Sequence, residues 1–121
     1  MAKILLVDDE DVILSIVGSL LEVEGHEVQS ALGGEAAIEM FSNADFDMMI
    51  SDIRMDPMNG ITVLEEAAKI KPEMKSIILS AMRSDSVKQE AMDLGAKAYI
   101  IKPFQPDAFL TIVRQVLERN P

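Results

Sequence analysis

Several residue types are missing or scarce in this chain, and each shortage excludes a kind of site. None of the 121 residues is cysteine, which excludes a disulfide framework and a thiolate nucleophile and is typical of a reducing cytosol. The one histidine, His26, lies in a predicted turn between Gly25 and Glu27. We expect it at the surface, and not as a phosphate carrier.

Basic residues are also scarce, because 11 lysines and arginines stand against 21 aspartates and glutamates. The formal net charge is −10 and the pI is near 4.4. A nucleic acid would be repelled by this charge unless a local basic patch overcame it. We therefore expect metal cations and basic protein surfaces as partners, and no direct binding to nucleic acid.

Long apolar runs are absent as well. The first run, residues 4–7, is too short for the apolar part of a signal peptide or for a membrane span. We expect no membrane partner and a cytoplasmic location. The composition, 49% hydrophobic and 26% charged, is ordinary for a soluble fold, and a length of 121 residues fits one domain. The predicted organisation is a single domain over residues 1–121.

What the chain does contain is an alternation of short apolar runs with segments of helical periodicity. Apolar strands separated by helices are typical of a parallel sheet that is covered on both faces. The predicted fold class is α/β, a flavodoxin-like doubly wound sheet of five parallel strands in the order 2-1-3-4-5 with five flanking helices. The predicted strands are 4–7, 27–31, 48–51, 77–79 and 98–101, and the predicted helices are 12–24, 34–41, 61–70, 84–94 and 106–117.

Apolar residues within these elements lead to predictions about burial. The nine methionines suit adaptable packing, and we expect Met48 and Met49 in the core. Met55, Met58 and Met82 follow strands in predicted loops, where our hypothesis is a partner surface. The first helix takes its apolar positions at helical spacing from Val12, Ile13, Ile16, Val17, Leu20 and Leu21.

Polar side chains stand where four of the predicted strands end. Asp8 and Asp9 follow the first strand, and Asp52 follows the third. Ser80 and Lys102 stand at the ends of the fourth and fifth strands. Parallel sheets bind ligands beyond the carboxyl ends of their strands, so these side chains are expected to meet at one crevice.

The residue types at this crevice indicate phosphoryl chemistry around a metal ion. Carboxylates crowded together repel one another unless a cation lies among them, and oxygen ligands favour Mg²⁺ or Mn²⁺. A carboxylate such as Asp52 can attack phosphorus when a metal and an amine such as Lys102 neutralise the oxygens. Ser80 could donate a hydrogen bond to a phosphoryl oxygen. Two plainer interpretations stay open, since residues 8–11 also suit a solvated helix start and Asp52 a loop cap.

Six short motifs, in this order, give the chain a family resemblance: Asp8-Asp9, Asp52-Ile53-Arg54-Met55, Met58-Asn59-Gly60, Ser80-Ala81, Gly95-Ala96 and Lys102-Pro103-Phe104. By these residues the chain from Lys3 to about Glu118 resembles a response-regulator receiver domain of the CheY-like kind. The resemblance implies that Asp52 is the phosphoacceptor and that Ser80 and Lys102 hold the phosphoryl group.

The same resemblance implies a metal site and a switch. Asp9, Asp52 and the backbone carbonyl of Arg54 would bind Mg²⁺, with Mn²⁺ as a substitute, and Asp8 would help through water. Tyr99 would couple to Ser80 and reshape the surface of the fourth helix, fifth strand and fifth helix.

The implied function is a phosphorylation-switched domain of a two-component regulatory system. Its phosphoryl donor would be a phosphohistidine on a sensor histidine kinase or on a histidine phosphotransfer protein of a phosphorelay. An unidentified output protein or domain would respond to the altered surface. Because the chemistry is self-modification followed by self-dephosphorylation, we do not expect an enzyme. The domain would act as a monomer or as a phosphorylation-dependent dimer.

One position departs from the receiver pattern, and three alternatives remain. Receiver domains commonly carry proline four residues after the phosphoacceptor, whereas this chain has Asp56 followed by Pro57. We expect an altered loop path with Asp56 facing solvent. A receiver module cut from a larger transcriptional regulator or hybrid kinase fits the same residues. A haloacid-dehalogenase-like phosphatase would need a second acid where Arg54 stands, and an FMN-binding flavodoxin-like protein would need a hydroxyl-rich first loop.

Overall fold

Five parallel strands form one sheet, with neighbours in the order β2-β1-β3-β4-β5. The structure is a computed structural model, and it describes residues 1–55 and 58–118. The strands are β1 Lys3–Asp8, β2 Glu27–Leu32, β3 Met48–Ser51, β4 Lys75–Ser80 and β5 Ala98–Ile101. The predicted fold class and strand order are confirmed.

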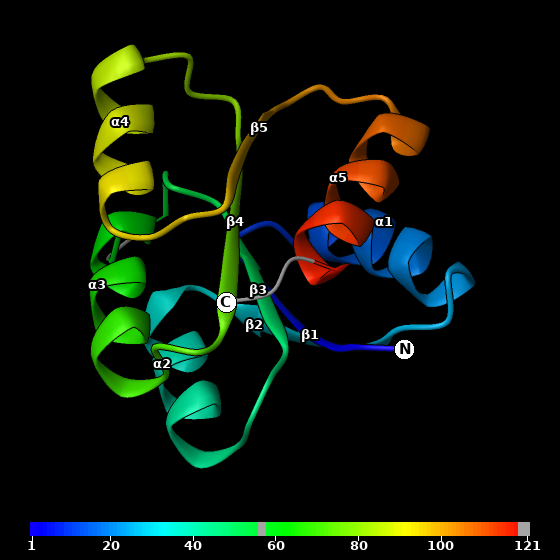
Figure 1. Ribbon diagram of the computed structural model, residues 1–121, viewed down its shortest axis with the longest axis horizontal. Coiled ribbons are helices and arrows are strands. Elements are labelled where there is room, and N and C mark those ends of the chain that lie inside the picture. Colours follow the sequence, from blue (N-terminus) through cyan, green and yellow to red (C-terminus); the bar gives the residue numbers. More distant parts are fainter. Residues whose placement is uncertain (56–57, 119–121) are drawn as a thin grey trace.

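Helices cover both faces of the sheet, with α1 and α5 on one face and α2, α3 and α4 on the other (Figure 1). Their bounds are α1 Asp11–Val23, α2 Gly34–Asn43, α3 Gly60–Ile70, α4 Asp85–Asp93 and α5 Pro106–Glu118. No helix in residues 1–55 and 58–118 is long and apolar enough to cross a membrane.

Each central strand supplies side chains to both cores, which explains why its apolar residues follow one another without alternating with polar ones. In β1, Leu5 packs with the α2, α3 and α4 side, whereas Leu6 packs with the α1 and α5 side. Met48 and Met49 of β3 divide in the same way, and both are fully buried. The prediction that these two methionines fill the core is confirmed.

The helix ends follow from local chemistry. Asn59 accepts a hydrogen bond from Thr62 N–H at 3.1 Å and caps α3, and Ser84 accepts one from Val87 N–H at 3.3 Å and caps α4. Gly25 and Gly95 follow α1 and α4 with φ angles of 92° and 108°. This left-handed backbone is costly for residues with a Cβ atom, so both helices stop where the sequence predicted.

Two apolar residues of α1 lie on its solvent side. Val12 and Ile16 are 66% and 53% exposed, whereas Leu14, Val17 and Leu21 are buried. With 3.6 residues per turn, residues 12 and 16 lie one above the other on the face turned away from the sheet. The sequence pattern did not separate the two faces, because α1 carries apolar residues on both.

His26 is half-buried, and its Nδ1 accepts a hydrogen bond from the backbone N–H of Ala2 at 3.1 Å. The prediction of a plain surface residue was therefore incomplete. Burial lowers the pKa of His26 below its ordinary 6.5, and the charge of the chain's amino terminus lowers it further. Neutral imidazole can accept this hydrogen bond, whereas imidazolium cannot.

We expect protonation of His26 to cost stability as the pH falls. Because the pKa is lower in the folded than in the unfolded state, the unfolded chain binds the proton first, and stability drops below about pH 6.5. The loss in the free energy of unfolding should be about 1 kcal/mol or less, which is the net contribution of one hydrogen bond. Urea denaturation between about pH 5 and 7.5 tests this against His26→Asn, which keeps an acceptor but does not titrate. Parallel pH profiles for the two proteins would contradict the assignment.

Candidate functional site

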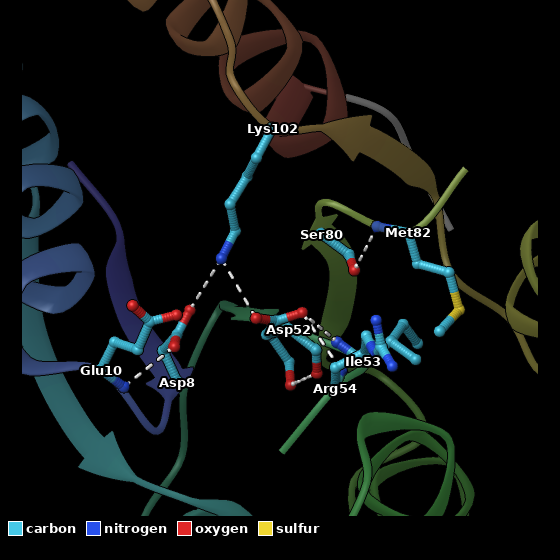
Figure 2. Close-up of polar contacts among 9 residues, drawn as sticks. Asp8, Glu10, Asp52, Ile53, Arg54, Ser80, Met82 and Lys102 are labelled. Carbon is cyan, nitrogen blue, oxygen red and sulfur yellow. Dashed lines mark hydrogen bonds and ion pairs between the residues drawn. The ribbon is translucent and has the colours of Figure 1, made fainter. Parts of the chain in front are cut away.

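Polar residues from four strands meet at the carboxyl edge of the sheet (Figure 2). Asp8 is the last residue of β1, and Asp52 comes directly after β3, its neighbour. Ser80 ends β4, and Lys102 comes directly after β5. The parallel register thus brings together residues up to 94 positions apart in the chain.

Lys102 joins the two buried aspartates. Its Nζ lies 3.2 Å from Asp8 Oδ2 and 3.1 Å from Asp52 Oδ2. The side chains are almost closed to solvent, with exposed fractions of 14% for Lys102, 4% for Asp8 and 8% for Asp52. Burial opposes the charge of Lys102, yet its bonds and charge interactions with Asp52 and Asp8 raise its pKa. The amine is therefore held as an ammonium group between two carboxyl groups.

Backbone donors fix the carboxyl group of Asp52. Its Oδ1 accepts hydrogen bonds from the N–H groups of Ile53 at 2.7 Å and Arg54 at 3.2 Å. Its Oδ2 faces Lys102, so the two oxygens have different partners. The backbone N–H of Asp52 donates to Val7 O at 3.1 Å and extends the link between β3 and β1. Asp52 thus has a fixed direction at the edge of the sheet.

Acidic groups crowd the start of α1. The Oδ1 of Asp8 accepts a hydrogen bond from Glu10 N–H at 3.0 Å. Burial raises the pKa of Asp8, as does the nearby Asp52, while Lys102 opposes the shift. One oxygen each from Asp8, Asp9 and Glu10 falls within 4.8 Å of the others. Glu10 was not among the predicted ligands, although its place in the acidic run was a signal for it.

This donor set fits a hard divalent cation. The grouped ligand atoms are carboxylate oxygens, the donors that Mg²⁺ and Mn²⁺ prefer. A bound cation would also lower the pKa of Asp8, and so oppose the effects of burial and of the nearby Asp52 charge, which raise it. Asp9 is exposed and grouped with Asp8 and Glu10, whereas the contact between Asp8 and Asp52 runs through Lys102.

Ser80 and Tyr99 interact through their side chains, and both also contact the backbone of Met82. The buried Ser80 Oγ accepts a hydrogen bond from Met82 N–H at 3.1 Å. Tyr99 donates its hydroxyl to Met82 O at 2.8 Å, and burial raises the pKa of Tyr99. The sequence analysis paired Ser80 with Tyr99 but did not predict the contacts with Met82. These contacts use backbone N–H and C=O groups, which every non-proline residue has.

Helix α3 begins directly against the acidic site. Gly60 N–H donates to Ile53 O at 2.8 Å. A Cβ atom on Gly60 would lie 2.0 Å from the carbonyl oxygen of Asp52, so only glycine fits. The motif contained Gly60, but the sequence did not indicate this steric role. Asp56 and Pro57, where the chain departs from the receiver pattern, lie outside the described residues.

Comparison with known sequences agrees with this geometry. The family model described as "Response regulator receiver domain" matches residues 4–114. The chemotaxis protein CheY of Thermotoga maritima is 35% identical over 115 residues, which cover 94% of this chain and 96% of CheY. The response regulator SaeR of Staphylococcus aureus is 34% identical over 98% of this chain and 52% of SaeR, so the chain spans about half of that relative.

A solved structure gives the same answer for the fold. The response regulator receiver domain protein (CheY-like) from Methanospirillum hungatei JF-1 superposes with a TM-score of 0.94. The two are 33% identical, and the alignment covers 98% of this chain and 94% of the other. With sequence, fold and acidic edge in agreement, the chain belongs to the response regulator receiver domain family of two-component signalling.

Proposed function

We propose that this chain accepts a phosphoryl group on Asp52 from a phosphohistidine of a sensor histidine kinase or a histidine phosphotransfer protein. The observation that carries the proposal is the fixed carboxyl group of Asp52, held by backbone N–H groups on one oxygen and by Lys102 on the other. The ammonium group lies where it can neutralise negative charge on an incoming phosphoryl group. The donor, the partner protein and the cytoplasmic location remain predictions.

The proposed Mg²⁺ ligands are Asp9, Asp52 and the backbone carbonyl of Arg54, and Asp8 would help through water. Glu10, which is grouped with Asp8 and Asp9, adds a fourth acid nearby. When bound, the ion would supply positive charge that offsets the repulsion between the carboxylate and the incoming phosphoryl oxygens. Lys102 provides the same kind of charge at the same edge of the sheet, from the end of β5.

Phosphorylation would be read out through Ser80, Met82 and Tyr99. Ser80 Oγ accepts a hydrogen bond from Met82 N–H, so a phosphoryl group that draws the Ser80 hydroxyl toward it would pull on the segment that carries Met82. Met82 in turn holds the Tyr99 hydroxyl, so movement of this segment changes the environment of the ring. The surface formed by α4, β5 and α5 would exist in an inactive and an active conformation, and phosphorylation would shift the equilibrium toward the active one.

The test is phosphorylation by a small donor in the presence of Mg²⁺. The intact mass of the wild type should rise by one phosphoryl group, and Asp52→Asn should show no increase, because an amide is a poor nucleophile. Asp107→Asn, which alters an exposed acid in the first turn of α5, is the control and should react like the wild type. Equal labelling of Asp52→Asn would refute the phosphoacceptor assignment.

We also propose that the domain is not an enzyme acting on separate substrates. Arg54 stands where a haloacid-dehalogenase-like phosphatase needs an acid, and the acidic loop after β1 lacks the hydroxyl groups of an FMN phosphate cradle.

A further inference from the structure

A cavity of about 330 Å³ lies at the amino edge of the sheet, the edge opposite the acidic site. We call it the amino-edge cleft. Its apolar lining includes Leu64 and Ala67 from the second half of α3 and Leu94 from the end of α4. Ser76, near the start of β4, lines it as well, about 13 Å along that strand from Ser80. Its size is that of a site for a small organic molecule.

Lysines outnumber acids around this cleft, which reverses the charge balance of the chain. Lys71, Lys75 and Lys97 line it, and Glu73 is the one acid among the lining residues that the structure describes. Over the whole chain, 11 basic residues stand against 21 acidic ones. Lys71 also forms an ion pair with Asp45, an exposed acid. An anion would therefore be attracted here, although the net charge of −10 opposes its binding to the rest of the surface.

The carbonyl ends of two helices lie at the cleft, and bare carbonyl groups would oppose an anion. In α3, Ala67 O accepts a hydrogen bond from Lys71 N–H at 2.8 Å. In α4, Met92 O accepts one from Gly95 N–H at 3.0 Å. These bonds occupy the carbonyl oxygens and weaken their repulsion of a ligand.

Contacts at the start of β4 hold the polar groups of the cleft in place. Lys75 Nζ donates to Leu117 O at 3.0 Å, so its half-buried side chain has a fixed direction. Lys97 N–H donates to Ser76 O at 2.8 Å, which joins the residue before β5 to β4. The Lys97 side chain is exposed. The backbone thus sets both lysines beside the apolar lining before any ligand binds.

We infer that the amino-edge cleft binds a small organic anion that has one acidic group on an apolar body, such as a medium-chain carboxylate. The apolar body would pack against Leu64, Ala67 and Leu94, and the acidic group would face Lys75 and Lys97. An ammonium group has three N–H donors, so Lys75 can bind the anion and keep its bond to Leu117 O. The inference does not depend on the proposed phosphorylation.

Octanoate is the probe, and octanol, which has the same chain length without the charge, is compared with it. We expect octanoate to bind the full chain with a Kd of about 1 mM, as for a weak ligand of about ten non-hydrogen atoms. Octanol should bind about fivefold more weakly, because it lacks the charge that attracts the lysines. The readout is two-dimensional NMR at constant ionic strength, in which the amide signals of Gly95 and Lys97 should shift as octanoate is added.

Lys97→Gln removes one ammonium group from the cleft and should raise the Kd of octanoate about threefold. Lys88→Gln is the matched control, because Lys88 is an exposed lysine of α4 outside the lining, and it should keep the wild-type Kd. Ala68→Glu adds an acid at an exposed position of the lining and should weaken binding at least as much as Lys97→Gln does. All three positions are exposed, so the variants should fold, as judged by circular dichroism.

Three results would each overturn the inference: equal Kd values for octanoate and octanol, equal losses in Lys97→Gln and Lys88→Gln, and shifts that leave out Gly95 and Lys97. Labelling of Asp52 is a separate measurement, so none of these results would count against the proposed function.

Discussion

Replacing Lys102 by methionine is expected to lower the free energy of unfolding by about 3 kcal/mol. The substitution keeps an unbranched apolar stem but removes the ammonium group that lies 3.2 Å from Asp8 and 3.1 Å from Asp52. Both carboxyl groups are nearly buried, and burial already raises the pKa of Asp8. Without the ammonium group, one of them must take up a proton or the edge of the sheet must open to water.

Urea denaturation with and without Mg²⁺ measures this effect. The divalent ion should restore more stability to Lys102→Met than it adds to the wild type, because the acids have lost their ammonium partner. Lys69→Met is the matched control, since Lys69 is 74% exposed and its ion pair with Glu66 spans 3.4 Å. An exposed pair of this kind contributes at most about 1 kcal/mol. Equal losses in the two variants would show that burial does not strengthen the Lys102 contacts.

The sequence predicted the sheet and most of the site because both depend on the same rule. Strands buried on both faces are apolar until they leave the sheet, so the first polar residue after each run marks its carboxyl end. Asp8, Ser80 and Lys102 obey this rule, and Asp52 stands one residue later than the rule predicts, after the buried Ser51. Parallel pairing then places these ends side by side, and no pairwise contact had to be known in advance.

Features that depend on backbone atoms or on the direction of a helix face could not be predicted. The N–H groups that hold Asp52 and Ser80 belong to Ile53, Arg54 and Met82, and any non-proline residue could supply them. Val12 and Ile16 have the helical spacing of the buried residues but face solvent. An apolar side chain can be buried, but its presence in the sequence does not show that it is.

Lys102 was predicted to face the phosphoryl group, yet its contacts with both Asp8 and Asp52 were not anticipated. The reason is charge balance, because the ammonium group of Lys102 lies against two nearly buried acids at once. The sequence analysis predicted that Lys102 pairs with an incoming phosphoryl group. In the structure the same ammonium group pairs with the carboxyl groups of Asp8 and Asp52. Its two contacts explain the large loss of stability expected when the ammonium group is removed.

Gly60→Ala should also cost about 3 kcal/mol, because the new Cβ atom has no room. It would lie 2.0 Å from the carbonyl oxygen of Asp52 and 2.8 Å from the Cα of Ile53. Both are backbone atoms, so no rotamer change can relieve the clash. The start of α3 must move away from the loop that carries Asp52, and the proposed phosphorylation of Asp52 should slow along with the loss of stability.

Gly18→Ala separates this clash from the general effect of adding a methyl group to a helix. Gly18 lies within α1, and its new Cβ would meet Leu6 at 3.6 Å and Val28 at 3.8 Å, which are ordinary contacts. Alanine is the better helix former by about 1 kcal/mol, so this variant should be as stable as the wild type or more stable. Urea denaturation and Asp52 labelling of both variants make the comparison. If Gly60→Ala matched Gly18→Ala in both measurements, the close approach of α3 to Asp52 would not be what holds the loop after β3 in place.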